Sequence, residues 1–248
     1  MKTKQLLSIK INLNPYNSFV DDLVGSALSD QSSYACVANV HMLIEAHRTS
    51  SFAKVVNSAD MVTPDGKPLT WALRFLYGIK QPRVAGMDLL PDLLAAAQKQ
   101  QIPVAFYGGT DDMLTKTKTF LQQNYPDIIV AKMYSPPFRQ LNAVEETSII
   151  QMFNASNARL IFVVLGCPKQ ERWMASMRNK INATMIGIGG ALPVLLGMQK
   201  RAPIWMQDSG LEWLFRLRQE PVRLFRRYAT TNALFIYLVL KEKLSSVK

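Results

Sequence analysis

Short apolar runs alternate with helical stretches between Gln5 and Gly190, and this alternation constrains the fold more than any other feature. The clearest example is segment 161–173, which reads IFVVLGCPKQERW. An apolar, β-branched run stops at Gly166, Pro168 follows, and good helix formers begin at Lys169. This order is typical of a buried strand, a tight turn and a helix with proline near its start.

The same periodicity predicts the other elements. Strands are expected at residues 5–11, 34–39, 59–63, 103–107, 127–132, 160–165 and 184–188. Helical stretches lie between most of them, for example at 87–100 and 144–154. Strands and helices alternating at this spacing indicate an α/β fold with a mostly parallel sheet and helices on both faces. The loops after parallel strands lie at one edge of the sheet, where ligands bind.

Several of these strands end in small or polar residues. Asn39 follows one strand, and Asp65 follows another within TPDGKP. Asp65 is equally compatible with a Pro-Asp-Gly turn, whose aspartate bonds nearby amides, and with a catalytic carboxylate. Asn39 is equally compatible with a helix cap and with a hydrogen-bonding partner for a sugar. The remaining strand ends carry Gly108, Gly109, Gly166, Gly189 and Gly190, and the helix after Gly166 begins with Lys169, Gln170 and Glu171.

The pattern changes near residue 200, where strand signals stop. Residues 204–218 and 221–243 are expected to form two helices divided at Pro221. We therefore expect an α/β domain at residues 1–198 and a helical appendage at 199–248. Residues 199–227 carry seven basic and three acidic side chains. This stretch favours an element that lies on an anionic membrane and binds lipid-linked phosphates, although a solvated basic helix face remains the alternative.

The net charge of +11 favours anionic partners, which are phosphorylated ligands, membrane surfaces or nucleic acid. A nucleic-acid-binding protein stays an alternative, but the aromatic residues near the arginines look amphipathic or buried rather than available for stacking on bases. No apolar run reaches the ~20 residues of a membrane span, so the protein is expected in the cytoplasm or on the cytoplasmic face of a membrane. An apolar appendage leaves pairing with a second copy open.

Several common cofactor and metal motifs are missing. There is no GxxxxGK[ST] run, and Leu192 replaces the third glycine of a dinucleotide fingerprint in GIGGAL. The two cysteines and two histidines lack zinc-ligand spacing. There is also no Asp-x-Asp pair of the kind that holds a metal on a nucleotide-sugar diphosphate. We therefore expect no cofactor, and any diphosphate that the protein handles would be neutralised by means other than a metal held on Asp-x-Asp, such as helix N-termini, backbone amides, arginine and lysine.

Seven separated segments resemble the WecG/TagA/CpsF glycosyltransferase family (glycosyltransferase family 26). They read VANVHM at 37–42, MVTPDGKPLTW at 61–71, RVAGMDLL at 83–90, FYGG at 106–109, LGCPKQERW at 165–173, GIGGA at 187–191, and RAPIWMQDSGLEWLFRLRQEPVRLFRRY at 201–228. The resemblance extends from about Ile9 to about Tyr237, and the last segment is long and specific.

This resemblance implies a Rossmann-like fold and an inverting, metal-independent transfer of a sugar from a UDP-sugar. The sugar would be of the N-acetylmannosamine type or a related hexose or uronic acid. The acceptor would be a polyprenyl-diphosphate-linked sugar used in surface polysaccharide biosynthesis, at the cytoplasmic face of the inner membrane. The protein would be peripheral to that membrane and would not bind nucleic acid.

The resemblance also implies roles for particular residues. Asp65 matches the general base, and Asn39 matches a polar position that lines the sugar site. The nucleotide-sugar would lie near Gly108, Gly109, Gly166, Pro168, Gln170, Glu171, Gly189 and Gly190. Appendage arginines Arg216, Arg223 and Arg226 match positions that bind the lipid diphosphate.

The chain departs from the family pattern at two positions. Val37 stands where many members have threonine, and the last glycine loop has Pro193 where many have aspartate. Because both missing groups are expected near the sugar, the sequence leaves the donor sugar open. A relative that kept the fold and altered its catalysis remains an alternative.

Overall fold

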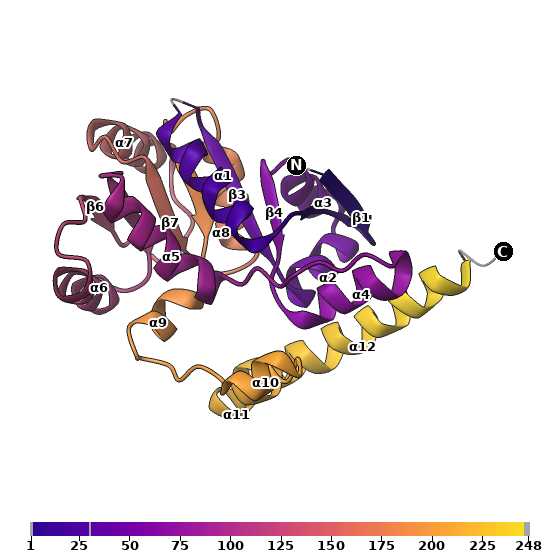
Figure 1. Cartoon of the computed structure of the whole chain (residues 1–248). Coiled ribbons are helices and arrows are strands. Elements are labelled where there is room, and N and C mark those ends of the chain that lie inside the picture. Colours follow the sequence, from indigo (N-terminus) through magenta and orange to yellow (C-terminus); the bar gives the residue numbers. More distant parts are fainter. Residues whose placement is uncertain (1, 30, 246–248) are drawn as a thin grey trace. The chain divides into compact units, whose positions relative to one another are not determined.

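The computed structural model describes residues 2–29 and 31–245 (Figure 1). The chain divides into two compact units. The first unit comprises Met1–Tyr16, Val37–Ala85 and Lys200–Lys248, and the second comprises Asn17–Cys36 and Gly86–Gln199. The expected division of the chain into domains 1–198 and 199–248 stays a prediction.

The predicted α/β fold is confirmed. Six strands form one sheet in the order β4-β3-β8-β7-β5-β6. They are β3 (Ser33–Ala38), β4 (Met61–Pro64), β5 (Val104–Gly108), β6 (Val130–Tyr134), β7 (Leu160–Val164) and β8 (Thr184–Gly187). The pairings β3–β8, β8–β7, β7–β5 and β5–β6 are parallel. Helices follow the strands and flank this sheet, as the alternating sequence pattern predicts.

The second unit is organised around its central strands. Every residue of β5 and β8, and all but the last of β7, is buried, which explains their uninterrupted apolar sequences. The rings of Phe106 and Phe162 pack 5.2 Å apart across β5 and β7. The helices of this unit are α1 (Tyr16–Leu28), α5 (Gly86–Lys99), α6 (Asp111–Asn124), α7 (Ala143–Ala155), α8 (Lys169–Met177) and α9 (Ala191–Leu195), with Tyr16 assigned to the first unit.

The first unit begins with a hairpin where a single strand was expected over residues 5–11. That expectation was wrong, since β1 (Lys2–Leu6) and β2 (Ile9–Leu13) pair antiparallel with Leu6 opposite Ile9. Leu7 adopts a φ of 52° at the turn, a conformation that a leucine in the sequence does not signal. Helices α2 (Val40–Arg48), α3 (Ser50–Asn57) and α4 (Lys67–Tyr77) complete this part of the unit.

The C-terminal part of the first unit has three helices, α10 (Ile204–Asp208), α11 (Glu212–Gln219) and α12 (Pro221–Ser245). The single helix expected over 204–218 is therefore wrong. The chain turns at Gly210, whose φ is +68° and whose Cα lies against the Trp71 ring of α4. The predicted helix start at Pro221 is confirmed, and α12 packs along α2 and α4 (Figure 1). In the described part of the chain, no helix combines the length and apolar character needed to cross a bilayer.

Candidate active site

In the first unit, the structure brings Asp65 and Asn39 to neighbouring strand ends. The backbone N–H of Asp65 donates to Ala38 O at 2.7 Å, so the residue after β4 is tied to the last residue of β3. Asp65 is half-buried, and Gly66 adopts a φ of +100° before α4 begins at Lys67. A carboxylate is thus held at the end of its strand by a short backbone bond and a turn.

Asn39 caps α2. Its side-chain oxygen accepts from Met42 N at 3.1 Å, which satisfies one of the amide groups that a helix start leaves unpaired. The capping interpretation of Asn39 is therefore confirmed. The side-chain NH₂ group takes no part in this bond and is the part of Asn39 suited to donate to a sugar, a role that stays a prediction.

The segment after β4 is also tied to the C-terminal helices, through contacts that the sequence did not single out. Val84 N donates to Pro64 O at 3.0 Å, which places Arg83 beside the end of β4. Arg83 forms an ion pair with Glu212 at 2.8 Å and donates to Gln207 at 3.1 Å. These bonds hold α10 and α11 against the strand end that carries Asp65.

The three arginines expected to bind a lipid diphosphate lie on α11 and α12. Arg216 is half-buried on α11, whereas Arg223 and Arg226 are exposed on α12. Arg223 is already paired with Glu220, with an Nη2–Oε1 distance of 2.9 Å. A phosphate at Arg223 would compete with this carboxylate, while Arg226 presents its charge to solvent. Their role as phosphate ligands stays a prediction.

In the second unit, three glycine-containing loops follow neighbouring parallel strands. Gly108 closes β5 with a φ of +104°, and a Cβ there would lie 2.5 Å from Val164 O of β7. Gly109 N donates to the same oxygen at 3.0 Å. The backbone approach between β5 and β7 therefore requires glycine at position 108, and it places the two loop starts side by side.

Gln170 connects the other two loops of this unit. Its side chain is buried, and Oε1 accepts from Gly166 N at 3.1 Å in the loop after β7. A Cβ at Gly187 would lie 2.7 Å from its Nε2, and a Cβ at Gly189 would lie 3.2 Å from its Oε1. The amide therefore fills the space beneath the last glycine loop, which ends with Gly190 as the N-cap of α9. The helix α9, which follows this loop, was not predicted by the sequence analysis.

Glu171 lies in the first turn of α8, after Pro168, which is the N-cap and follows a cis Cys167–Pro168 peptide bond. The Glu171 side chain is completely buried. Burial raises the pKa of its carboxyl group, and Gln170 and Cys167 oppose this only in part. The Glu171 carboxyl group is therefore enclosed by the protein in this structure, and its contact with a nucleotide stays a prediction.

The described residues contain no cluster of three or more histidine, cysteine or acidic side chains arranged to hold a metal ion. Each unit thus contains a different part of the set of site residues that the sequence predicts. Asn39, Asp65 and the arginines belong to the first unit, and the glycine loops with Pro168, Gln170 and Glu171 belong to the second.

The relatives found by comparison with known proteins include three with the name N-acetylglucosaminyldiphosphoundecaprenol N-acetyl-beta-D-mannosaminyltransferase. The protein of Bacillus subtilis strain 168 is 29% identical over 98% of this chain and 93% of its own length. That of Bacillus spizizenii is 28% identical over 100% of this chain and 95% of its own. That of Staphylococcus aureus strain MW2 is 27% identical over 87% and 82%.

The match to a protein family extends over nearly all of the chain. Residues 4–248 match the family described as the glycosyl transferase WecG/TagA/CpsF family. The match includes both compact units and the C-terminal helices. This chain therefore belongs to the WecG/TagA/CpsF family of glycosyl transferases.

Proposed function

We propose that this protein transfers an N-acetylmannosamine-type sugar, or a related hexose or uronic acid, from a UDP-sugar to a polyprenyl-diphosphate-linked sugar. The proposal is supported by family membership over residues 4–248 and by relatives whose names describe this acceptor. The relatives match along almost their whole length, so the likeness extends to the entire transferase rather than to one module.

The observation that carries the proposal is the position of Asp65. This carboxylate ends a strand of the parallel sheet, where α/β proteins bind ligands, and its backbone is fixed by Ala38 O. In the proposed reaction, Asp65 takes the proton of the acceptor hydroxyl as that oxygen attacks the anomeric carbon and UDP leaves. A carboxylate is a weak base for an alcohol, so it acts mainly in the transition state, where the hydroxyl becomes acidic as the new bond forms.

We expect the anomeric configuration of the sugar to invert, because the proposed reaction is a single displacement of UDP. The names of the relatives describe a β-linked product. A single in-line attack on an α-linked UDP donor would give that configuration, whereas retention through two displacements would need a nucleophile on the protein. We propose that arginines and backbone amides neutralise the departing diphosphate without a metal, which agrees with the absence of an Asp-x-Asp pair in the sequence.

We further propose that α12 lies on the cytoplasmic face of the inner membrane. Its apolar residues at helical spacing form one exposed stripe, which consists of Val222, Phe225, Ala229, Ala233, Ile236, Leu240 and Leu244. Leu224, Phe235 and Val239 are buried on another side of the helix. Arg223 and Arg226 flank the stripe, as expected for an amphipathic element on anionic lipid. Without a membrane, the same stripe would favour pairing with a second copy.

The test of the proposed function is turnover. The purified chain is incubated with a panel of UDP-sugars and a polyprenyl-diphosphate-linked N-acetylglucosamine acceptor, and the glycolipid product is identified by mass spectrometry. We expect one added N-acetylhexosamine or related sugar in a β linkage, formed in the presence of EDTA. The absence of any product across the panel would refute the proposal.

A further inference from the structure

The side chain of Arg227 on α12 has an unusual environment for an arginine. Its Nε–H is buried and has no hydrogen-bond partner among the described residues. Within residues 2–29 and 31–245, its guanidinium group interacts with the neighbouring Tyr228 ring, at 5.7 Å from the ring centroid. Arginine has five N–H donors and no acceptor, and a buried donor without a partner costs the protein stability.

The acidic side chains on the helices around Arg227 are all paired with other groups. Helix α12 packs against α2, α4 and α11. On α2, Glu45 lies 3.8 Å from Arg48 and 4.0 Å from His41. Glu212 of α11 pairs with Arg83, and α4 contains no acidic residue.

The two remaining acidic residues of this region follow the same rule. Glu220 precedes α12 and binds Arg223, and Glu242 near the end of α12 accepts from Tyr77. Arg227 is therefore left without a carboxylate partner among the described residues, while Arg216 and Arg226 add further positive charge to the same helices. This surplus of positive charge suits an anionic ligand.

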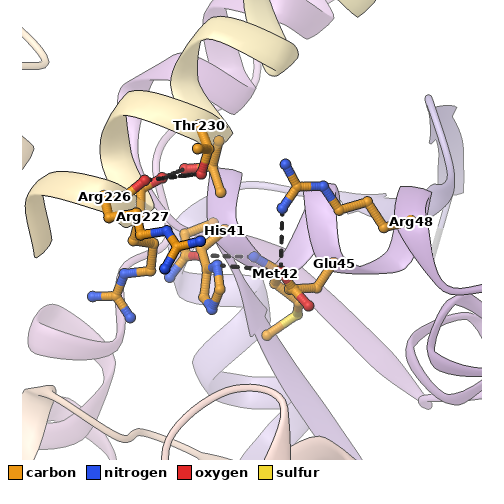
Figure 2. Close-up of polar contacts among 9 residues, drawn as sticks. His41, Met42, Glu45, Arg48, Arg226, Arg227 and Thr230 are labelled. Atoms are coloured by element: carbon orange, nitrogen blue, oxygen red, sulfur yellow. Dashed lines mark hydrogen bonds and ion pairs between the residues drawn. The ribbon is translucent and has the colours of Figure 1, made fainter. Parts of the chain in front are cut away.

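Arg227 lies near the part of the first unit that carries the candidate catalytic residues. Figure 2 shows Arg226, Arg227 and Thr230 of α12 next to the start of α2, which carries His41 and Met42. Asn39 caps that helix, and the residue before it, Ala38, accepts the backbone bond of Asp65. The backbone of α12 is fixed here because the buried Thr231 donates to Arg227 O at 2.8 Å.

We propose that Arg227 binds the diphosphate group of a substrate, donating its buried Nε–H and one terminal N–H to phosphate oxygens. A guanidinium group offers these two donors in a fixed fork that matches phosphate geometry. Arg223 would have to break its ion pair with Glu220 to bind a phosphate, whereas Arg227 has no such ion pair to break among the described residues. The diphosphate comes from the UDP-sugar or from the lipid carrier; this identification of the source rests on the proposed function.

The test measures binding of inorganic pyrophosphate to the full chain by calorimetry. We expect Arg227→Gln to weaken pyrophosphate affinity about tenfold or more, the effect of removing a charge-assisted hydrogen bond. Lys241→Gln makes the same charge change on an exposed site of α12 and is expected to leave the affinity unchanged. Equal affinity of the Arg227→Gln and wild-type proteins would overturn the proposal, as would no binding by the wild type.

Two further measurements separate ligand binding from a structural role. Because Arg227 has no carboxylate partner, Arg227→Gln should keep or raise the unfolding temperature without ligand. A lowered unfolding temperature with unchanged affinity would instead mean that Arg227 is structural. Should the Gln variant not fold, Arg227→Lys keeps the charge and loses the fork, and it should still bind more weakly than wild type; equal affinity would overturn the proposal.

The source of the diphosphate is identified with UDP and farnesyl diphosphate as separate probes. The probe whose affinity falls with Arg227→Gln is the one that Arg227 contacts, and loss for neither would overturn the proposal. A wild-type protein that binds pyrophosphate through Arg227 but forms no glycolipid would refute the proposed function alone, so the two failures are distinguishable.

Discussion

Replacing Gly108 by alanine tests whether the backbone approach between β5 and β7 is as close as the structure shows. The added Cβ would lie 2.5 Å from Val164 O and 2.9 Å from the Leu165 side chain. The Val164 carbonyl cannot move without disturbing the hydrogen bonds between β7 and its neighbouring strands. The strain therefore falls on the loop that follows β5. Alanine at a φ of +104° costs about 1–3 kcal/mol, and overpacking costs a further 1–3 kcal/mol.

We therefore expect Gly108→Ala to lower the free energy of unfolding by about 2–6 kcal/mol in urea titrations followed by circular dichroism. Gly25→Ala is the matched control. Gly25 is exposed within α1, and a Cβ there would meet nothing within 4 Å, so alanine should stabilise the helix by about 0.5–1 kcal/mol. Destabilisation by Gly108→Ala of less than about 1 kcal/mol would contradict the close approach.

Three further predictions concern the candidate site and the C-terminal helix. Asp65→Asn should lower glycosyl transfer by about 100-fold or more while UDP-sugar binding is retained, because only the base is lost; unimpaired turnover would remove the base assignment. Glu171 has a raised pKa in the folded state, so its ionisation destabilises the protein as the pH rises above the ordinary value of 4.5. Glu171→Gln should therefore be more stable than wild type at pH 7, and the difference should shrink as the pH falls towards 4.5 and stay constant below it; an unchanged pH profile would contradict the burial. Replacing both Phe225 and Ile236 by serine should reduce retention on anionic liposomes without changing the unfolding temperature, because both side chains are exposed; equal retention would count against the membrane stripe.

The strands of the second unit were predictable from sequence because β5, β7 and β8 are buried on both faces and therefore read as uninterrupted apolar runs. The hairpin at the N-terminus was not, because its turn contains Leu7 and Ser8 rather than the glycine or asparagine that marks such turns. The break between α10 and α11 had a signal in Gly210, which the apolar periodicity of the surrounding residues concealed.

The candidate site shows the same limit. The sequence predicted that Asn39, Asp65 and the glycines lie at strand ends, because that follows from the alternation of elements alone. It did not predict that Gln170 lies against two loops, nor that the buried Arg227 Nε–H has no hydrogen-bond partner in the described part of the chain. Both properties depend on side chains that are distant in sequence and adjacent in space. The periodicity of apolar residues in the sequence does not reveal such contacts.

One glutamine therefore couples two loops of the second unit. The Gln170 Oε1 accepts from Gly166 N, and the same amide group lies against Gly187 and Gly189. A ligand that displaces the peptide at Gly166 must rotate this amide, and the rotation changes the space below Gly189. The two loops are therefore expected to respond together to an incoming molecule. A change in NMR chemical shift in one loop should be accompanied by a change in the other.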